Sequence, residues 1–384
     1  MSDTECEILQ QLRNTPQIFA RLVSSDETGL KLQKCLRDEF PADLVRAALT
    51  VHELRAKATA KFSRADRMWF DTKGLEQSTA EAVALHKAQR FTGNVYDFCC
   101  GIGSDAIALA RNGCNVAAAD LSTACCLLTQ WNAECFEVPD RIETAVVDVT
   151  AIEDRSTLLH VDPDRRPTGR RVRRVEDCVP GLEQLQQWAG EFPGGAIKLS
   201  PASNFGGKFP DSEIELISLD GECREATVWF GDLAGDAPFR ATVLPSGESI
   251  AAEPLSAWTN VGELGPWLYD PDPTVVRSGL VDVLAERLGL RRLDDAEEYL
   301  TGDVLVDSPF VRPFEVVENL PNNQREIRQA FRRHPAQQVE IKCRHIPIQA
   351  EAVRRKLPLE GTDPAVLVFT RQSGKARAVL CRRP

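Results

Sequence analysis

The sequence of 384 residues contains no apolar run that approaches the roughly 20 residues needed to span a bilayer. Its first residues are acidic and lack an apolar signal core, which argues against secretion. It also lacks internal repeats and low-complexity tracts, and its hydrophobic and charged fractions of 43% and 27% are those of an ordinary globular protein. We therefore expect a cytoplasmic protein of two or three domains with no membrane partner.

No Cys-x-x-Cys pair occurs among the 12 cysteines, which are scattered through the chain. Two pairs are directly adjacent, Cys99-Cys100 and Cys125-Cys126, and neither has the spacing of a zinc site. We interpret the cysteines as mostly buried apolar residues in a reducing compartment, and we expect no metal.

The net charge of −11 argues against a protein that coats nucleic acid indiscriminately. The charge is uneven, however. Residues 312–384 hold 15 Lys or Arg and 7 Asp or Glu, a net of +8 that leaves −19 on the rest of the chain. A local excess of this kind indicates either a surface for an anionic partner or an ordinary charged face.

Helical periodicity predicts helices throughout the first 90 residues. Ser78-Thr79-Ala80-Glu81 has the pattern of a helix start, with a hydroxyl that caps the first turn. From residue 95 to about 245, short apolar strands alternate with helices, which predicts a mostly parallel sheet. The predicted strands are 94–98, 115–120, 142–148, 158–162, 195–200, 213–219 and 225–230. The last two leave no room for a helix, so we expect an antiparallel hairpin around Asp220-Gly221.

The remainder of the sequence predicts a connecting region and a small α+β module. Residues 231–275 are rich in Gly, Pro and polar residues, with a strand at 240–244, and a helix follows at 273–290. In the tail, the patterns predict strands at 337–343, 365–370 and 376–381 and a helix at 349–356.

Acidic residues stand at or next to the carboxyl ends of the first three predicted strands, namely Asp97, Asp120 and Asp148. Because the carboxyl ends of parallel strands meet at one edge of a sheet, these carboxylates belong to one crevice. Gly101 and Gly103 follow the first strand and leave room for a ligand against the backbone. The turn reads Gly-x-Gly-Ser-Asp rather than the Gly-x-Gly-x-x-Gly of dinucleotide sites, which favours a methyl-donor pocket.

On these motifs the chain resembles class I, Rossmann-like S-adenosylmethionine-dependent methyltransferases over residues 74–230, and most closely the RNA N2-guanine methyltransferases of the trimethylguanosine-synthase type. The matching elements are Ser78–Glu81, Asp97–Gly103, Asp120, Asn132–Glu134 and Asp148. It also resembles bacterial methyltransferases with a C-terminal THUMP-like domain, through Asp162–Arg166 and the tail from about residue 310. By analogy, that tail suggests RNA as a partner, either tRNA or rRNA.

The resemblance implies a mostly parallel seven-stranded sheet with a terminal antiparallel hairpin, preceded by a helical region and followed by a small α+β domain. The implied divisions are a helical region at 1–90, the methyltransferase domain at 91–250, a connecting region at 251–309 and a THUMP-like domain at 310–384.

The resemblance also implies S-adenosylmethionine as cofactor and assigns its binding residues. These are Thr79, Asp97, Cys99, Gly101, Gly103, Asp120, Leu121, Asp148 and Val149. The methyl group and its acceptor would meet at Asp162, Pro163, Asp164 and Arg165, where Asp162 and Asp164 are candidate general bases. Methyltransferases that act on exocyclic amines usually continue this corner with a second proline and an aromatic residue. Since Asp164 and Arg165 stand there instead, amine methylation is one option among several.

Arginines follow this corner closely and form a candidate phosphate-binding collar, or else a solvated loop. The candidate RNA-binding residues are Arg166, Arg170, Arg171, Arg173, Arg174, Lys198, Ser200 and Asn204. We therefore expect an enzyme that transfers a methyl group from S-adenosylmethionine to a nucleobase in RNA. Two other interpretations stay open at this point. In one, the acceptor is a protein or a small molecule; in the other, the chain is a non-catalytic RNA-binding or assembly protein with a degenerate donor site.

Overall fold

The computed structural model describes residues 3–25, 27, 29–165 and 174–384. The chain forms two compact units, one of Met1–Ser212 with Thr227–Gly235 and the other of Glu213–Ala226 with Asp236–Pro384. This division differs from the predicted boundaries at 90, 250 and 309, which stay a prediction.

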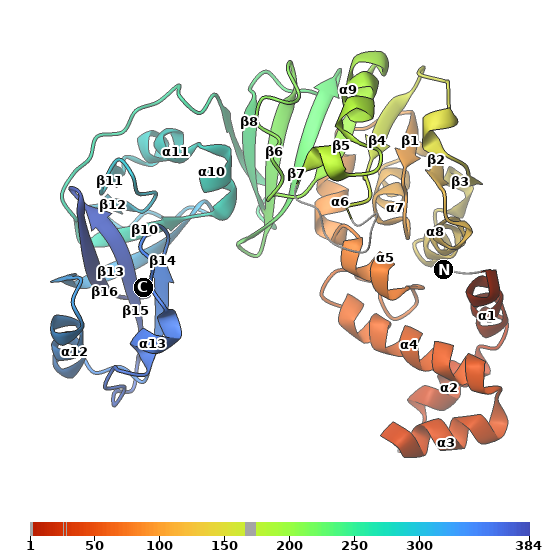
Figure 1. Cartoon of the computed structure of the whole chain (residues 1–384), viewed down its shortest axis with the longest axis horizontal. Coiled ribbons are helices and arrows are strands. Elements are labelled where there is room, and N and C mark those ends of the chain that lie inside the picture. The colour runs from red at the N-terminus through yellow and green to blue at the C-terminus, as the bar shows by residue number, and fades with distance from the viewer. Residues whose placement is uncertain (1–2, 26, 28, 166–173) are drawn as a thin grey trace. The chain divides into compact units, whose positions relative to one another are not determined.

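The first unit begins with helices, as the periodicity predicts (Figure 1). They are α1 (Asp3–Arg13), α2 (Gln17–Val23), α3 (Gly29–Glu39), α4 (Ala42–Ala58), α5 (Thr72–Gln77) and α6 (Glu81–Ala88). Their apolar stripes form one core, in which Leu12, Ile18 and Val45 are fully buried. No helix in the described part of the chain is both long and apolar enough to cross a membrane.

The predicted capping of α6 by a hydroxyl is wrong. α6 begins after Ala80, which has no side chain able to cap it. The hydroxyl of Ser78 instead donates to a carbonyl at the end of α5, and Thr79 Oγ1 donates to Asp105 Oδ2 at 2.6 Å. Ser78 therefore closes the end of α5, and Thr79 has a distant partner that the local sequence pattern does not reveal.

Strand order identifies the fold of the first sheet. Among the described residues it has nine strands in the order β3-β2-β1-β4-β5-β7-β6-β8-β9. They are β1 (Asn94–Phe98), β2 (Asn115–Asp120), β3 (Ile142–Val146), β4 (Leu158–Val161), β5 (Gly194–Leu199), β6 (Glu213–Leu219), β7 (Glu222–Gly231), β8 (Phe239–Leu244) and β9 (Glu248–Ala252). β1 to β5 are parallel, and β7 reverses direction after the turn at Asp220-Gly221.

This arrangement confirms the predicted Rossmann-like class I fold with a terminal hairpin. The sheet is two strands longer than the predicted seven, because β8 pairs in parallel with β6 and β9 pairs antiparallel with β8.

Helices cover both faces of the parallel part of the sheet. They are α7 (Ser104–Arg111), α8 (Thr123–Cys135) and α9 (Leu182–Glu191). Side chains alternate along β1, so Phe98 packs on Trp188 of α9, with ring centroids 5.2 Å apart. Asp97 points to the opposite face, where its Oδ1 lies 2.7 Å from His160 Nδ1. β1 thus buries an aromatic cluster on one side and a polar group on the other.

A second sheet lies in the second unit and has the order β11-β12-β10-β13-β16-β15-β14 within the described residues. Its elements are β10 (Trp267–Pro271), α10 (Pro273–Ser278), α11 (Val281–Leu288), β11 (Arg291–Arg292), β12 (Leu300–Gly302), β13 (Val311–Pro321), α12 (Gln324–Arg333), β14 (Gln338–Cys343), α13 (Ala350–Arg354), β15 (Pro364–Gln372) and β16 (Lys375–Arg382). The α+β tail is confirmed. The single helix predicted at 273–290 is wrong, because Gly279 adopts φ +74° and ends α10.

A substitution at Gly195 tests how closely β5 packs against its neighbours. A Cβ at this position would lie 2.1 Å from the Leu159 carbonyl oxygen and 2.6 Å from the Phe230 ring. We expect Gly195→Ala to destabilise the protein by about 1–3 kcal/mol or more in chemical denaturation. Gly190→Ala is the control, since a Cβ there meets nothing within 4 Å and a helix favours Ala by about 0.5–1 kcal/mol. Equal stability of the two variants would contradict this packing.

Candidate active site

A cavity of about 800 Å³ lies at the carboxyl ends of the parallel strands. Its wall is formed by α5, the turn after β1, the ends of β2 and β5, and the segments that follow β3 and β4. A cavity of this size suits a nucleoside-sized ligand. The strand-end crevice that the sequence predicts is therefore present.

The turn after β1 is held in an unusual backbone conformation. Cys99, Gly101 and Gly103 have φ values of +61°, +58° and +84°. For Cys99, which carries a side chain, this conformation costs about 1–2 kcal/mol. Cys99 and Gly101 line the cavity, whereas a Cβ on Gly103 would lie 2.8 Å from Thr129 Cγ2. Gly103 therefore lets the turn pack closely on α8.

Asp120 joins the end of β2 to this turn. Its Oδ2 accepts from the Gly101 backbone N–H at 3.1 Å, and its Oδ1 accepts from the Ser122 N–H at 2.9 Å. Burial raises the pKa of Asp120, and these two hydrogen bonds oppose the rise. Leu121, which is 67% exposed, extends this side of the cavity wall.

Asp148 and Val149 form the part of the wall that follows β3. Asp148 is exposed and accepts from the hydroxyl of Thr150 at 2.7 Å and from its N–H at 3.0 Å, which together lower the pKa of the carboxyl. Val149 is buried.

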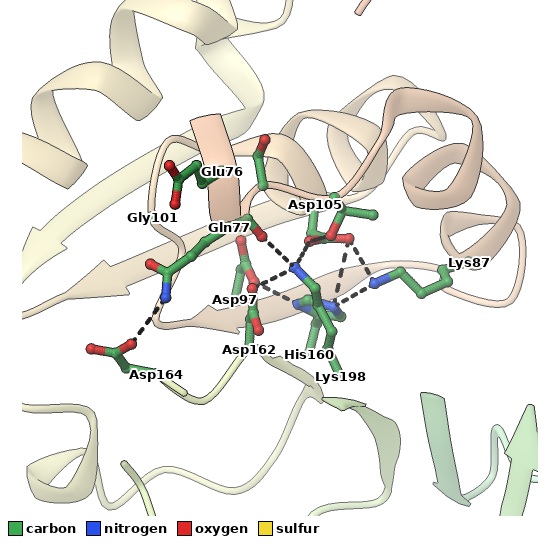
Figure 2. A network of polar contacts seen from close by, with 12 residues as sticks. Glu76, Gln77, Lys87, Asp97, Gly101, Asp105, His160, Asp162, Asp164 and Lys198 are labelled. Carbon is green, nitrogen blue, oxygen red and sulfur yellow. Dashed lines mark hydrogen bonds and ion pairs between the residues drawn. The ribbon is translucent and has the colours of Figure 1, made fainter. Parts of the chain in front are cut away.

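A network of buried charged side chains adjoins the cavity (Figure 2). Its centre is Asp105, in the first turn of α7, which also lines the cavity. Lys87 Nζ lies 2.8 Å from Asp105 Oδ1, and Lys198 Nζ lies 3.8 Å from Oδ2. Burial alone would raise the pKa of Asp105, but the cationic charge of Lys87 and Lys198 outweighs this effect and holds the pKa well below its ordinary value.

Lys198 connects this network to the segment after β4. Its Nζ lies 2.5 Å from Asp162 Oδ2 and donates to the Gln77 carbonyl at 3.3 Å. Next in the segment, Asp164 is held by Lys73 Nζ at 3.0 Å and by Gln77 Nε2 at 3.2 Å. α5 thus fixes the corner at Asp162–Arg165, all four residues of which line the cavity.

The remaining predicted residues divide into two groups. Arg166, Arg170, Arg171 and Arg173 lie outside the described residues. Asp97, Gly103, Arg174, Ser200 and Asn204 are described but do not line the cavity. Asn204 accepts from the Val175 N–H, and the exposed Arg174 lies 3.7 Å from Glu176, so both contact the segment that follows the arginine run.

Sequence reasoning missed Lys73, Gln77, Lys87, Asp105 and His160 as site residues. A signal existed for two of them, because Lys87 lies in an Ala-rich helix and His160 in an apolar strand. Charged or polar groups inside apolar runs indicate buried partners. Lys73 and Gln77 have no comparable signal, since they lie on a short polar helix.

The chain matches three family models. The match described as RNA cap guanine-N2 methyltransferase covers residues 92–174, and the match described as THUMP domain-like covers residues 311–383. A domain of unknown function matches residues 17–58.

Two curated relatives come from Mycobacterium tuberculosis strains CDC 1551 and H37Rv. Each is named an uncharacterized S-adenosylmethionine-dependent methyltransferase and is 35% identical over 309 residues, which cover 79% of this chain and 84% of the relative. The chain belongs to the S-adenosylmethionine-dependent methyltransferases. A solved structure of a putative methyltransferase from Porphyromonas gingivalis W83 shares the fold of this methyltransferase, with a TM-score of 0.75 and 19% identity over 99% of this chain and 98% of that one.

The cavity of the methyltransferase fits its cofactor chemically. Six Asp residues line it against three Lys or Arg, an acidic excess that suits a sulfonium cation. Asp97 Oδ2 is buried and has no hydrogen-bond partner within the described residues, so a ligand ammonium would satisfy it. When bound, S-adenosylmethionine supplies the activated methyl group.

Asp105→Asn tests the buried network. The substitution leaves Lys87 without its counter-charge, so we expect a loss of about 3–5 kcal/mol in the free energy of unfolding at pH 7. Because the pKa of Asp105 is lowered by folding, its stabilising effect is present above the ordinary value of 3.8 and is lost as the pH falls below it. The difference between wild type and variant should therefore narrow below about pH 4. The exposed Asp140→Asn is the control, and a similar loss in both variants would contradict the network.

Asp120→Ala tests the donor side of the cavity. We expect the affinity for S-adenosylhomocysteine to fall about 10- to 100-fold in calorimetry, the range for losing a charged hydrogen-bonding group. Asp140→Ala, which removes an exposed acid outside the cavity wall, should bind like wild type. Unchanged affinity in Asp120→Ala would remove this residue from the donor site.

Proposed function

We propose that this methyltransferase transfers a methyl group from S-adenosylmethionine to a nucleobase in RNA. The observation that carries the proposal is the arginine face of α12, defined as Arg325, Arg328 and Arg332. All three side chains are exposed, in a chain whose net charge is −11. They form no ion pair with an acid in the described part of the chain.

The geometry of α12 presents these arginines together. Ile327, Ala330 and Phe331 are buried, which fixes the helix on the module with the arginine face outward. The spacing of three and four residues places the guanidinium groups on one face, about 4.5 and 6 Å apart along the axis. Such a row suits successive phosphates, which carry most of the affinity of proteins for nucleic acids.

The descriptions of the matching families support RNA as the acceptor. The family descriptions that match residues 92–174 and 311–383 name an RNA cap guanine-N2 methyltransferase and a THUMP-like domain. For this chain we infer RNA as the substrate class.

The proposed donor-binding residues are those that the resemblance assigns, from Thr79 to Val149, with Asp105 added because it lines the cavity. Asp162 is the residue placed to receive a hydrogen bond or a proton from the acceptor. Lys198 pairs with one of its oxygens and holds the carboxylate in place. Arg165 offers a planar guanidinium on which a base can stack, in place of the missing aromatic residue.

RNA binding across a salt series tests the arginine face. For wild type, log affinity should fall steeply with log salt. In the triple variant Arg325→Ala, Arg328→Ala, Arg332→Ala the slope should become shallower by about 2–3, close to one unit for each phosphate that an arginine no longer neutralises. Filter binding of bulk cellular RNA gives this slope.

Arg333→Ala is the matched control on the same helix. Arg333 pairs with Glu318 at 2.6 Å, so the slope should stay that of wild type. An equal change in the control and the triple variant would refute the arginine face as a specific surface. Absence of RNA binding at low salt would overturn the proposal in favour of a protein or small-molecule acceptor.

A further inference from the structure

His160 belongs to the buried network around Asp105 and has no role in the proposed chemistry (Figure 2). It comes from β4 and is 1% exposed. Its Nδ1 lies 2.7 Å from Asp97 Oδ1, and its Nε2 lies 3.3 Å from Lys87 Nζ. The rings of Phe91 and His160 pack in a T-shaped arrangement, with centroids 6.4 Å apart.

These contacts fix the tautomer of the ring. Asp97 Oδ1 accepts from Nδ1, which therefore carries a proton. The ammonium group of Lys87 has donors only, so the Nε2 it faces is the acceptor and carries no proton. In this tautomer the proton on Nδ1 is directed at Asp97.

Asp97 is thus held from one side only. Oδ1 has its partner in His160, whereas Oδ2 is buried without one among the described residues. Asp97 does not itself line the cavity, but it lies two residues before Cys99, which does. Burial raises the pKa of Asp97, and the His160 hydrogen bond opposes that rise.

We propose that His160 is a positioning residue of the donor site. With its ring fixed by Lys87, it orients the Asp97 carboxylate so that Oδ2 receives the ammonium of the donor's amino-acid part. The inference concerns the donor side alone and does not depend on RNA as the acceptor.

Two variants separate this role from simple packing. In His160→Asn the amide nitrogen takes the place of Nδ1 and can still donate to Asp97. In His160→Gln the amide lies where Nε2 was, toward Lys87, and leaves Asp97 without its donor. Both variants remove the ring, so both lose its packing.

The readout is affinity by calorimetry for two ligands. S-adenosylhomocysteine has the amino-acid part, and 5′-methylthioadenosine lacks it. We expect His160→Gln to bind S-adenosylhomocysteine about 10-fold or more weakly, His160→Asn to bind it nearly as wild type, and neither to lose affinity for 5′-methylthioadenosine. Equal losses in the two variants, or a parallel loss for both ligands, would overturn the proposal.

A measurement on the wild-type protein covers the case in which the variants fail to fold. Nitrogen-15 NMR of labelled histidine at pH 7 should show one buried ring with Nδ1 protonated and Nε2 not. The opposite tautomer, or a doubly protonated ring, would contradict the assignment.

Discussion

The buried carboxylate of Asp105 is the interaction on which the active site depends. An isolated charge in that position would be prohibitively costly, so the fold must bring cations to it. Lys87 comes from α6, Lys198 from β5 and the hydroxyl of Thr79 from the segment between α5 and α6. The Asp105 carboxylate therefore connects α6 and the segment before it to β5 of the sheet.

Lys198 links the buried Asp105 to the acceptor corner of the active site. It faces Asp105 on the donor wall and Asp162 at the acceptor corner, so the two halves of the site share one cation. α5 adds a second restraint through Lys73 and Gln77, which hold Asp164. The segment after β4 is in this way fixed by elements that lie far from it in the sequence.

The donor half of the site could be predicted from the sequence because its signals are local. A strand, an acid and a glycine turn stand next to one another, and parallel strands bring Asp120 and Asp148 to the same edge. The mostly parallel sheet with its terminal hairpin followed from the same alternation. Its extension did not, because the strand predicted at 240–244, which is β8, was assigned to a connecting region and β9 was not predicted.

The buried network could not be predicted in this way. Its members are spread from Lys87 to Lys198, and no spacing rule connects them. The hydroxyl of Thr79 was misread for the same reason, because a local capping pattern competes with Asp105, a partner that only the tertiary fold supplies. α12 was missed because its only apolar residues are Ile327, Ala330 and Phe331, too few to stand out in a tail rich in arginine.

The central claim is that this methyltransferase acts on a base in RNA, and transfer of a labelled methyl group tests it most directly. Purified protein is incubated with methyl-labelled S-adenosylmethionine and fractionated RNA, protein and metabolites from cells that lack the enzyme. The account predicts label in RNA that nuclease digestion releases as a methylated nucleoside, and its loss with Asp162→Ala. Label confined to protein or to metabolites would contradict it.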